Sequence, residues 1–289
     1  MLSPVRVRSQ QTLRRPAVVS GVGYWSGLPN RVEMRPAAAG SGVVFVRDDF
    51  DVPVRVQATV DRRVDAVART NLAVAGVCVQ MVEHVLSALA GMEIDCCEIH
   101  LTAEELPGLD GSSRAYVDAI ESAGVESLGA PVEPIVVDRV LRIGDESSWV
   151  ELAPPRTAGL CLEYELEHDH PSIGRQRLSL HVTPESYREQ LAAARTFLTE
   201  EEAGRLQAAG LGLSVGHRDL IVFGSAGPID NELRWPDECV RHKMLDLVGD
   251  LALVGQPLHA SVRARRSGHR LNAEAAACVL SCSRDMVAA

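Results

Sequence analysis

Hydrophobic and polar positions divide the chain into short strand-like runs and longer runs with helical spacing. Runs rich in β-forming residues, separated by turn residues, predict strands over Gly42–Val46, Val52–Val60, Ile135–Ile143, Gly159–Leu166 and Arg177–Val182. Apolar residues three or four positions apart predict helices over Glu83–Ala90, Arg114–Ala123, Glu185–Ala193, Thr199–Ala208 and Pro236–Val254. Strands and helices are mixed in both halves of the chain, which favours the α+β class.

The segment 124–134 has the composition of a linker between domains. Residues that interrupt regular structure gather in it: Gly124, Gly129, Pro131 and Pro134. We therefore predict a boundary near residue 130, with one α+β domain over 1–130 and a second over 131–289. The stretches 83–91 and 242–250 resemble each other, each with a histidine at the start of an apolar helix. This similarity indicates that the two halves are related.

Composition and charge narrow the function classes. The 289 residues carry a net charge of −10, which argues against a nucleic-acid partner, and 4% of them are aromatic, which leaves few platforms for stacking bases. No segment reaches the roughly 18 apolar residues of a membrane-spanning helix, and no apolar run of signal-peptide length follows the N-terminal arginines. Seven cysteines, including the adjacent Cys96 and Cys97 but no CxxC pair, indicate reduced thiols. We expect a cytoplasmic protein.

The predicted helix 236–254 carries a second pattern beside its apolar face. His242, Asp246 and Asp250 follow one another at four-residue spacing, so they lie on one side of the helix. A histidine and an aspartate four residues apart can bind one metal ion. An exposed polar stripe has the same spacing, so the helix alone leaves both interpretations open.

The pair Glu83-His84 at the start of another apolar helix favours a metal site. His84, His242 and Asp246 would give three protein ligands and one open position, the arrangement of a catalytic zinc site. Glu83, beside a ligand, could accept a proton from water. The alternative for His84 is a histidine satisfied within the core.

Two further segments offer groups for proton transfer and charge stabilisation. His269 follows a glycine in a basic loop, where Asp250 could pair with its imidazole and raise its pKa; a surface turn is the alternative. Thr196 lies in a polar break between helices, and its hydroxyl could donate to an oxyanion. The segment 168–170, in which two histidines flank an aspartate, is interpreted as a solvated loop rather than a second metal site.

With these residues assembled, the chain resembles the zinc-dependent UDP-3-O-acyl-N-acetylglucosamine deacetylases of lipid A synthesis. The resemblance extends from Gly21 to Asn272. Six blocks carry it in the same order: Val82–Leu89, Leu106–Ser112, Ala194–Phe197, Val240–Asp246, Gly249–Leu251 and Ser267–Asn272. Six ordered blocks are far more specific than any single one.

The resemblance implies a Zn²⁺ cofactor, an acylated UDP-N-acetylglucosamine substrate and acetate as a product. We expect a monomer. The implied metal ligands are His84, His242 and Asp246, the implied general base is Glu83, and the implied general acid is His269 supported by Asp250. Lys243 and Thr196 would stabilise charge on the amide oxygen. The implied fold has two similar α+β domains with the active site between them. An insert at about 198–223 would help to form a passage for the acyl chain.

Three positions depart from the family pattern. Trp25 stands where the family has a polar pocket residue, Val215 lies where an insert loop usually reads Gly-Gly-Ser, and Glu232 replaces a glycine. None of them is an implied ligand, acid or base, so we interpret the site as intact with altered substrate recognition. The alternatives are a deacetylase of another N-acetylated sugar and a non-catalytic relative that binds a nucleotide sugar. Fe²⁺ suits the same ligands as zinc.

Overall fold

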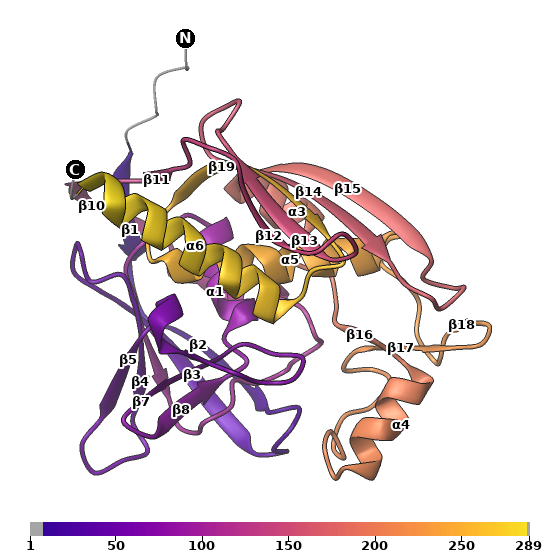
Figure 1. The fold of residues 1–289 in the computed structure, drawn as a ribbon. Coiled ribbons are helices and arrows are strands. Elements are labelled where there is room, and N and C mark those ends of the chain that lie inside the picture. Colours follow the sequence, from indigo (N-terminus) through magenta and orange to yellow (C-terminus); the bar gives the residue numbers. More distant parts are fainter. Residues whose placement is uncertain (1–7, 288–289) are drawn as a thin grey trace.

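The computed structural model describes residues 8–287 and contains two main sheets with helices between them (Figure 1). The first half of the chain contains β1 (Ser9–Leu13), β2 (Ala17–Val22), β3 (Pro29–Pro36), β4 (Val43–Arg47), β5 (Val54–Gln57), β6 (Arg63–Val64), β7 (Asn71–Val74), β8 (Val77–Gln80), α1 (Glu83–Gly91), β9 (Cys97–Leu101) and α2 (Arg114–Ala123). The second half begins with β10 (Val125–Pro131), β11 (Ile135–Val136), β12 (Leu141–Gly144), β13 (Trp149–Ala153), β14 (Leu160–Glu167), β15 (Arg175–Val182) and α3 (Pro184–Gln190). It ends with β16 (Phe197–Thr199), α4 (Glu200–Ala208), β17 (Ile221–Gly224), β18 (Gly227–Pro228), α5 (Glu238–Leu251), β19 (Leu258–Arg265) and α6 (His269–Val287). The observed elements confirm the α+β class.

The two main sheets have the same topology. The strand order is β2-β3-β9-β4-β5 in the first and β12-β13-β19-β14-β15 in the second, where β11 also pairs with β19. In each sheet the last strand of the half is inserted at the centre, and it runs parallel to one neighbour (β4 or β14) and antiparallel to the other. The helix before each central strand is α1 in one half and α5 in the other. The relation between the halves that the sequence indicates is therefore present in the fold.

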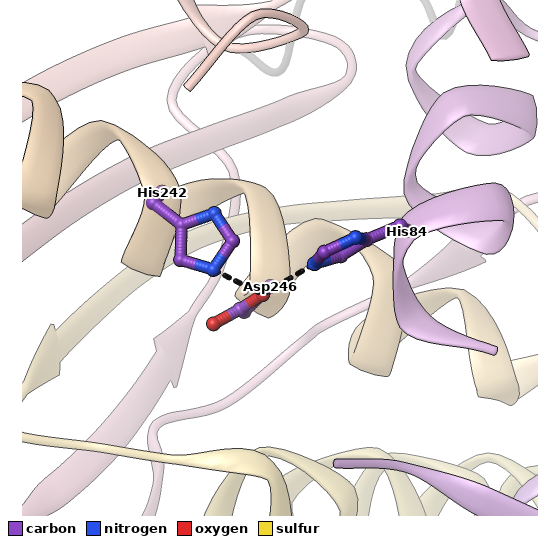
Figure 2. Close-up of side chains that lie close together, drawn as sticks. All are labelled: His84, His242 and Asp246. Atoms are coloured by element: carbon purple, nitrogen blue, oxygen red, sulfur yellow. Dashed lines mark ion pairs between the residues drawn. The ribbon is translucent and has the colours of Figure 1, made fainter. Parts of the chain in front are cut away.

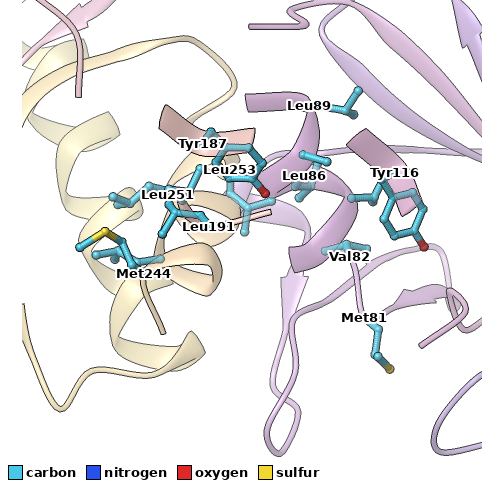
Figure 3. Close-up of a cluster of buried hydrophobic side chains, with 14 of the residues drawn as sticks. Met81, Val82, Leu86, Leu89, Tyr116, Tyr187, Leu191, Met244, Leu251 and Leu253 are labelled. Carbon is cyan, nitrogen blue, oxygen red and sulfur yellow. The ribbon is translucent and has the colours of Figure 1, made fainter. Parts of the chain in front are cut away.

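Helices α1 and α5 pack against each other between the two sheets (Figure 1). Gly249 allows their close approach, since a Cβ there would lie 2.1 Å from the carbonyl oxygen of Glu83. The hydroxyl of Ser87 on α1 donates to the carbonyl of Leu245 on α5 at 2.7 Å. The apolar side chains around this contact are almost completely buried (Figure 3): Leu86, Leu89, Tyr187, Leu191, Met244 and Leu251. This core fixes the relative position of the two helices that supply the site.

Most of the predicted elements are present, and the structure differs from the prediction at the linker, at residues 135–143 and at the C-terminal helix. The linker predicted at 124–134 is instead largely strand β10, which pairs antiparallel with β1. The single strand predicted over 135–143 is two short strands, β11 and β12. Helix α6 has no counterpart among the predicted elements, because its buried face consists largely of small alanines.

The segment from β16 to β17 forms a small unit at the edge of the second half. Strands β16 and β17 pair in parallel, and α4 connects them and lies apart from both sheets in Figure 1. The side chain of Thr199 caps α4 by accepting from the backbone of Glu202, whose carboxylate accepts from Thr199 in return. Elsewhere, the seven cysteines are free thiols. Among the described residues, no helix combines the length and apolar character needed to cross a bilayer.

Candidate active site

Helices α1 and α5 bring three potential metal ligands together. His84 lies in the first turn of α1, and His242 and Asp246 lie one turn apart on α5. One ligand atom from each residue falls within 4.8 Å of the others, and all three side chains are buried. In the described part of the chain, this is the one group of three or more such side chains. The polar stripe on α5 is therefore not exposed to solvent.

The two imidazoles face the same carboxylate oxygen (Figure 2). The Oδ1 atom of Asp246 lies 3.4 Å from Nε2 of His242 and 3.7 Å from Nε2 of His84, and it is buried without a hydrogen-bond partner. A buried carboxylate oxygen without a partner is costly unless a cation compensates it. Two imidazole nitrogens and one carboxylate oxygen are donors that suit a divalent metal ion. The residues therefore fit a metal site.

The protonation state of His242 also suits metal binding. Its Nδ1 atom lies 3.2 Å from the carbonyl of Ala194, so Nδ1 carries the proton and Nε2 keeps its lone pair. Burial, above all, lowers the pKa of His242 to about 3. The imidazole is therefore neutral at pH 7, as a metal ligand must be.

Lys243 places a positive charge beside this group. Its Nζ atom lies 2.9 Å from Oδ2 of Asp246, opposite the oxygen that faces the histidines. Burial alone would lower the pKa of Lys243, but the carboxylate of Asp246 outweighs burial and raises it above its ordinary value. The ammonium group therefore stays charged, and it lies over the ring of Phe197.

Glu83 has the environment of a proton acceptor. Its side chain is buried at the start of α1, and Oε2 accepts a hydrogen bond from the backbone N–H of Thr70 at 3.0 Å. Burial is the largest influence on its pKa, which lies above the ordinary value for glutamate. A carboxylate with a raised pKa accepts a proton more readily near neutral pH.

His269 is the first residue of α6, and Asp250 holds its imidazole. Nδ1 of His269 lies 3.0 Å from Oδ2 of Asp250, which is fully buried and also accepts from Asn272 at 2.9 Å and, through Oδ1, from the Thr70 hydroxyl at 2.6 Å. Burial alone would lower the pKa of His269, but Asp250 outweighs burial and raises it to about 9. The pairing of Asp250 with His269 that the sequence suggested is therefore present, and His269 does not lie in a surface turn.

Thr196 lies at the edge of the site with its hydroxyl already engaged. Its backbone N–H and its Oγ1 both donate to the carbonyl of Gly111, at 2.7 and 3.1 Å. The preceding Arg195 forms a buried ion pair with Glu238, with 2.8 Å between Nε and Oε1, which anchors this segment. The hydroxyl must rotate away from Gly111 before it can donate to an oxyanion.

One cavity of about 1000 Å³ joins these groups to the segment between β16 and β17. Its polar wall contains Glu83, His84, Thr196, His242, Lys243, Asp246 and His269. Its apolar wall contains Trp25, Leu198, Leu206, Leu211, Val215 and Val222. A cavity with converging polar groups at one place and apolar side chains elsewhere suits an amphiphilic ligand.

The three departures from the family pattern have different positions. The indole of Trp25 lines the cavity and stacks on Arg69, whose Cζ atom lies 4.4 Å from the ring centroid. Val215 also lines the cavity, whereas Glu232 does not and contributes its carbonyl to Arg195. In the segment 168–170, the ring of His168 packs near Phe197 and that of His170 near Phe223.

Sequence reasoning missed two members of the polar network, Thr70 and Asn272. Both are buried, and both donate to Asp250. Asn272 lies three residues after His269, so its place in the first turn of a helix would have been the signal to follow. Thr70 has no such local signal, because it is 180 residues from Asp250.

Comparison with known proteins agrees with this geometry. The family model described as UDP-3-O-acyl N-acetylglycosamine deacetylase matches residues 10–281. A UDP-3-O-acyl-N-acetylglucosamine deacetylase of Anaeromyxobacter sp. (strain Fw109-5) is 37% identical over 265 residues, covering 91% of this chain and 86% of the relative. The protein of the same name from Brucella ovis is 36% identical over 274 residues, covering 94% and 95%. The chain therefore belongs to the UDP-3-O-acyl N-acetylglycosamine deacetylase family.

Proposed function

We propose that this protein hydrolyses the N-acetyl group of a UDP-3-O-acyl-N-acetylglucosamine, in lipid A synthesis, and that it uses zinc to do so. One observation carries the proposal: the unpartnered Oδ1 atom of Asp246 faces two imidazoles beside Glu83 and His269 in a single large cavity. Structural zinc sites are closed by four protein ligands, whereas three ligands leave a position open for catalysis. The apolar wall of the cavity suits the acyl chain.

His84, His242 and Asp246 would hold the ion. Zinc bound there would act as a Lewis acid toward the acetamide carbonyl and would make water more acidic. Glu83 accepts the proton of the water that attacks the carbonyl carbon. Its buried position and raised pKa suit a base that works near neutral pH.

The carbon–nitrogen bond then breaks, and the amine nitrogen takes a proton from His269. Because Asp250 engages Nδ1 of His269, the proton that is transferred lies on Nε2. The Lys243 ammonium and the Thr196 hydroxyl line the same cavity and would stabilise negative charge on the carbonyl oxygen. The products are acetate and a free amine.

All the proposed groups come from one chain, so we propose that a monomer is competent for the reaction. The seven free cysteines are typical of a reducing compartment and support a place in the cytoplasm.

The direct test is acetate release from an acylated UDP-N-acetylglucosamine by the purified, zinc-loaded protein. We expect acetate and free amine in equal amounts, and no release after chelation. A zinc-loaded protein that binds the substrate without releasing acetate would support the non-catalytic alternative instead.

Trp25 supports a second candidate function, the deacetylation of another N-acetylated sugar. An indole stacked on Arg69 contributes an aromatic surface to the cavity, where the family pattern leads us to expect a polar residue. A panel of N-acetylated sugars with and without the nucleotide and the acyl chain separates the two activities. Higher kcat/KM for a substrate that lacks either group would overturn the primary assignment.

Replacing Asp250 with asparagine should move the basic limb of the pH profile to lower pH. His269 must be protonated to act as the acid, so activity falls as the pH rises through the pKa of His269. Asp250 holds that pKa at about 9, and a neutral amide cannot. Measurement of kcat/KM from neutral to alkaline pH checks this, with the acidic limb as an internal control. A basic limb at the same pH in both proteins would assign it to another group.

A further inference from the structure

Thr70 lies where the two halves of the active site meet. It is completely buried, immediately before β7, and the β7–β8 hairpin returns the chain to the start of α1. The hairpin turns at Ala75 and Gly76, with φ angles of 49° and 81° that suit a tight two-residue turn. The backbone N–H of Val82 then donates to the Thr70 carbonyl at 3.1 Å. Thr70 is therefore held firmly beside Glu83.

Both carboxylates of the proposed acid–base system accept a hydrogen bond from Thr70. Its backbone N–H donates to Oε2 of Glu83 at 3.0 Å, and its hydroxyl donates to Oδ1 of Asp250 at 2.6 Å. Within residues 8–287, no other residue donates a hydrogen bond to both carboxylates. Glu83 belongs to the first half of the chain and Asp250 to the second, so one residue connects the two.

The hydrogen bond from the Thr70 hydroxyl fixes which carboxylate oxygen of Asp250 faces His269. Because Thr70 occupies Oδ1, Oδ2 is left to the His269 and Asn272 side chains. A buried hydrogen bond to a charged acceptor is strong, since water cannot replace it. Without the hydroxyl, the Asp250 carboxylate loses the contact that fixes its rotation. His269 would then lose its alignment with the amine nitrogen, which it must protonate after the water activated by Glu83 has attacked the carbonyl carbon.

We propose that Thr70 is a positioning residue for the deacetylation: it fixes the position of the His269–Asp250 pair relative to Glu83. The inference rests on the proposed function, because it needs Glu83 and His269 to be the base and the acid. Thr70 does not line the cavity, so it acts through these groups and does not touch the substrate.

The test compares Thr70→Val and Thr70→Ser with the wild-type protein. Valine keeps the shape and the backbone N–H and removes only the hydroxyl, so we expect kcat to fall by about 10- to 100-fold, the range for supporting hydrogen bonds around a site. KM and zinc content should not change, because neither the cavity wall nor a ligand is altered. Serine restores the hydroxyl and should recover most of kcat.

Thr12→Val is the matched control. Thr12 is also buried, and its hydroxyl oxygen accepts from the backbone of Ala37 at 2.9 Å, but it is not part of the site. It should lose thermal stability to a similar extent and keep kcat. If Thr70→Val fails to fold, Thr70→Cys replaces the strong O–H donor with a weak S–H donor and carries the same prediction.

The outcomes separate this inference from the proposed function. A zinc-loaded wild-type protein that releases no acetate would overturn the proposed function and the inference with it. An active wild type whose kcat is matched by Thr70→Val would overturn the inference alone. The double variant Thr70→Val/Asp250→Asn adds a second check, because residues that act as a unit lose less together than the product of their separate losses. Fully multiplicative losses would contradict the proposed connection.

Discussion

Alanine in place of His84, His242 or Asp246 is expected to reduce bound zinc from about one ion per chain to a small fraction of that amount. Each substitution leaves two protein ligands for the ion. The effect should be severe for Asp246, because its Oδ1 atom faces both histidines and has no other partner. Elemental analysis after dialysis measures the metal, and acetate release should fall with it.

The three variants should remain folded, because the core between α1 and α5 does not depend on these side chains. Circular dichroism checks the fold. His259→Ala is the matched control: it removes a partly buried histidine whose Nδ1 has no partner and which lies outside the site cavity, so zinc content should not change. Wild-type zinc content in all three alanine variants would exclude the proposed site.

Helices α1 and α2 were predictable because each carries a strong local pattern. Apolar spacing alone gives α2 its observed limits, Arg114–Ala123, and the next residue, Gly124, ends the helix with a φ angle of 74°. The same holds for the start of α1 at Glu83. In both cases the information lies within one or two turns of the chain.

The elements that were missed depend on distant partners or on small side chains. Residues 125–131 have the composition of a linker, but β1, from the start of the first half, supplies a partner strand. Long-range pairing of this kind leaves no local signal. Helix α6 is buried through alanines such as Ala273, Ala275 and Ala276, so no stripe of large apolar residues marks it.

Helix α5 shows why the metal site could only be partly predicted. Its four-residue spacing of His242, Asp246 and Asp250 was visible, yet such a stripe normally faces solvent. In the fold, every residue of α5 except Lys243 is buried, because α1, α6 and the second sheet surround the helix. The polar side is therefore compensated by other buried groups rather than by water. The pair Glu83-His84 had suggested His84 as the third ligand, and the fold places it beside His242 and Asp246, whereas the contact between Thr70 and Asp250 appears only in the fold.

Replacing Glu83 with glutamine is expected to leave zinc bound and to lower kcat by about 10²- to 10⁴-fold, the range for loss of a general base. The amide oxygen of glutamine can still accept from the Thr70 N–H, but the side chain cannot take a proton from water. Steady-state acetate release and elemental analysis of the same preparation give both quantities. Loss of zinc together with activity would make Glu83 a ligand and would overturn the assigned roles.

The same variant should show that Glu83 is kept for chemistry rather than for stability. Burial raises the pKa of Glu83, so its ionised form costs free energy of folding that a neutral amide of the same shape does not. In metal-free protein, Glu83→Gln should therefore melt at the wild-type temperature or above it. Asp95→Asn is the control, since Asp95 pairs with Arg8 and accepts from the backbone of Gln11 outside the site. It should melt at a lower temperature and keep kcat, and the opposite pattern in the two variants would contradict this view of Glu83.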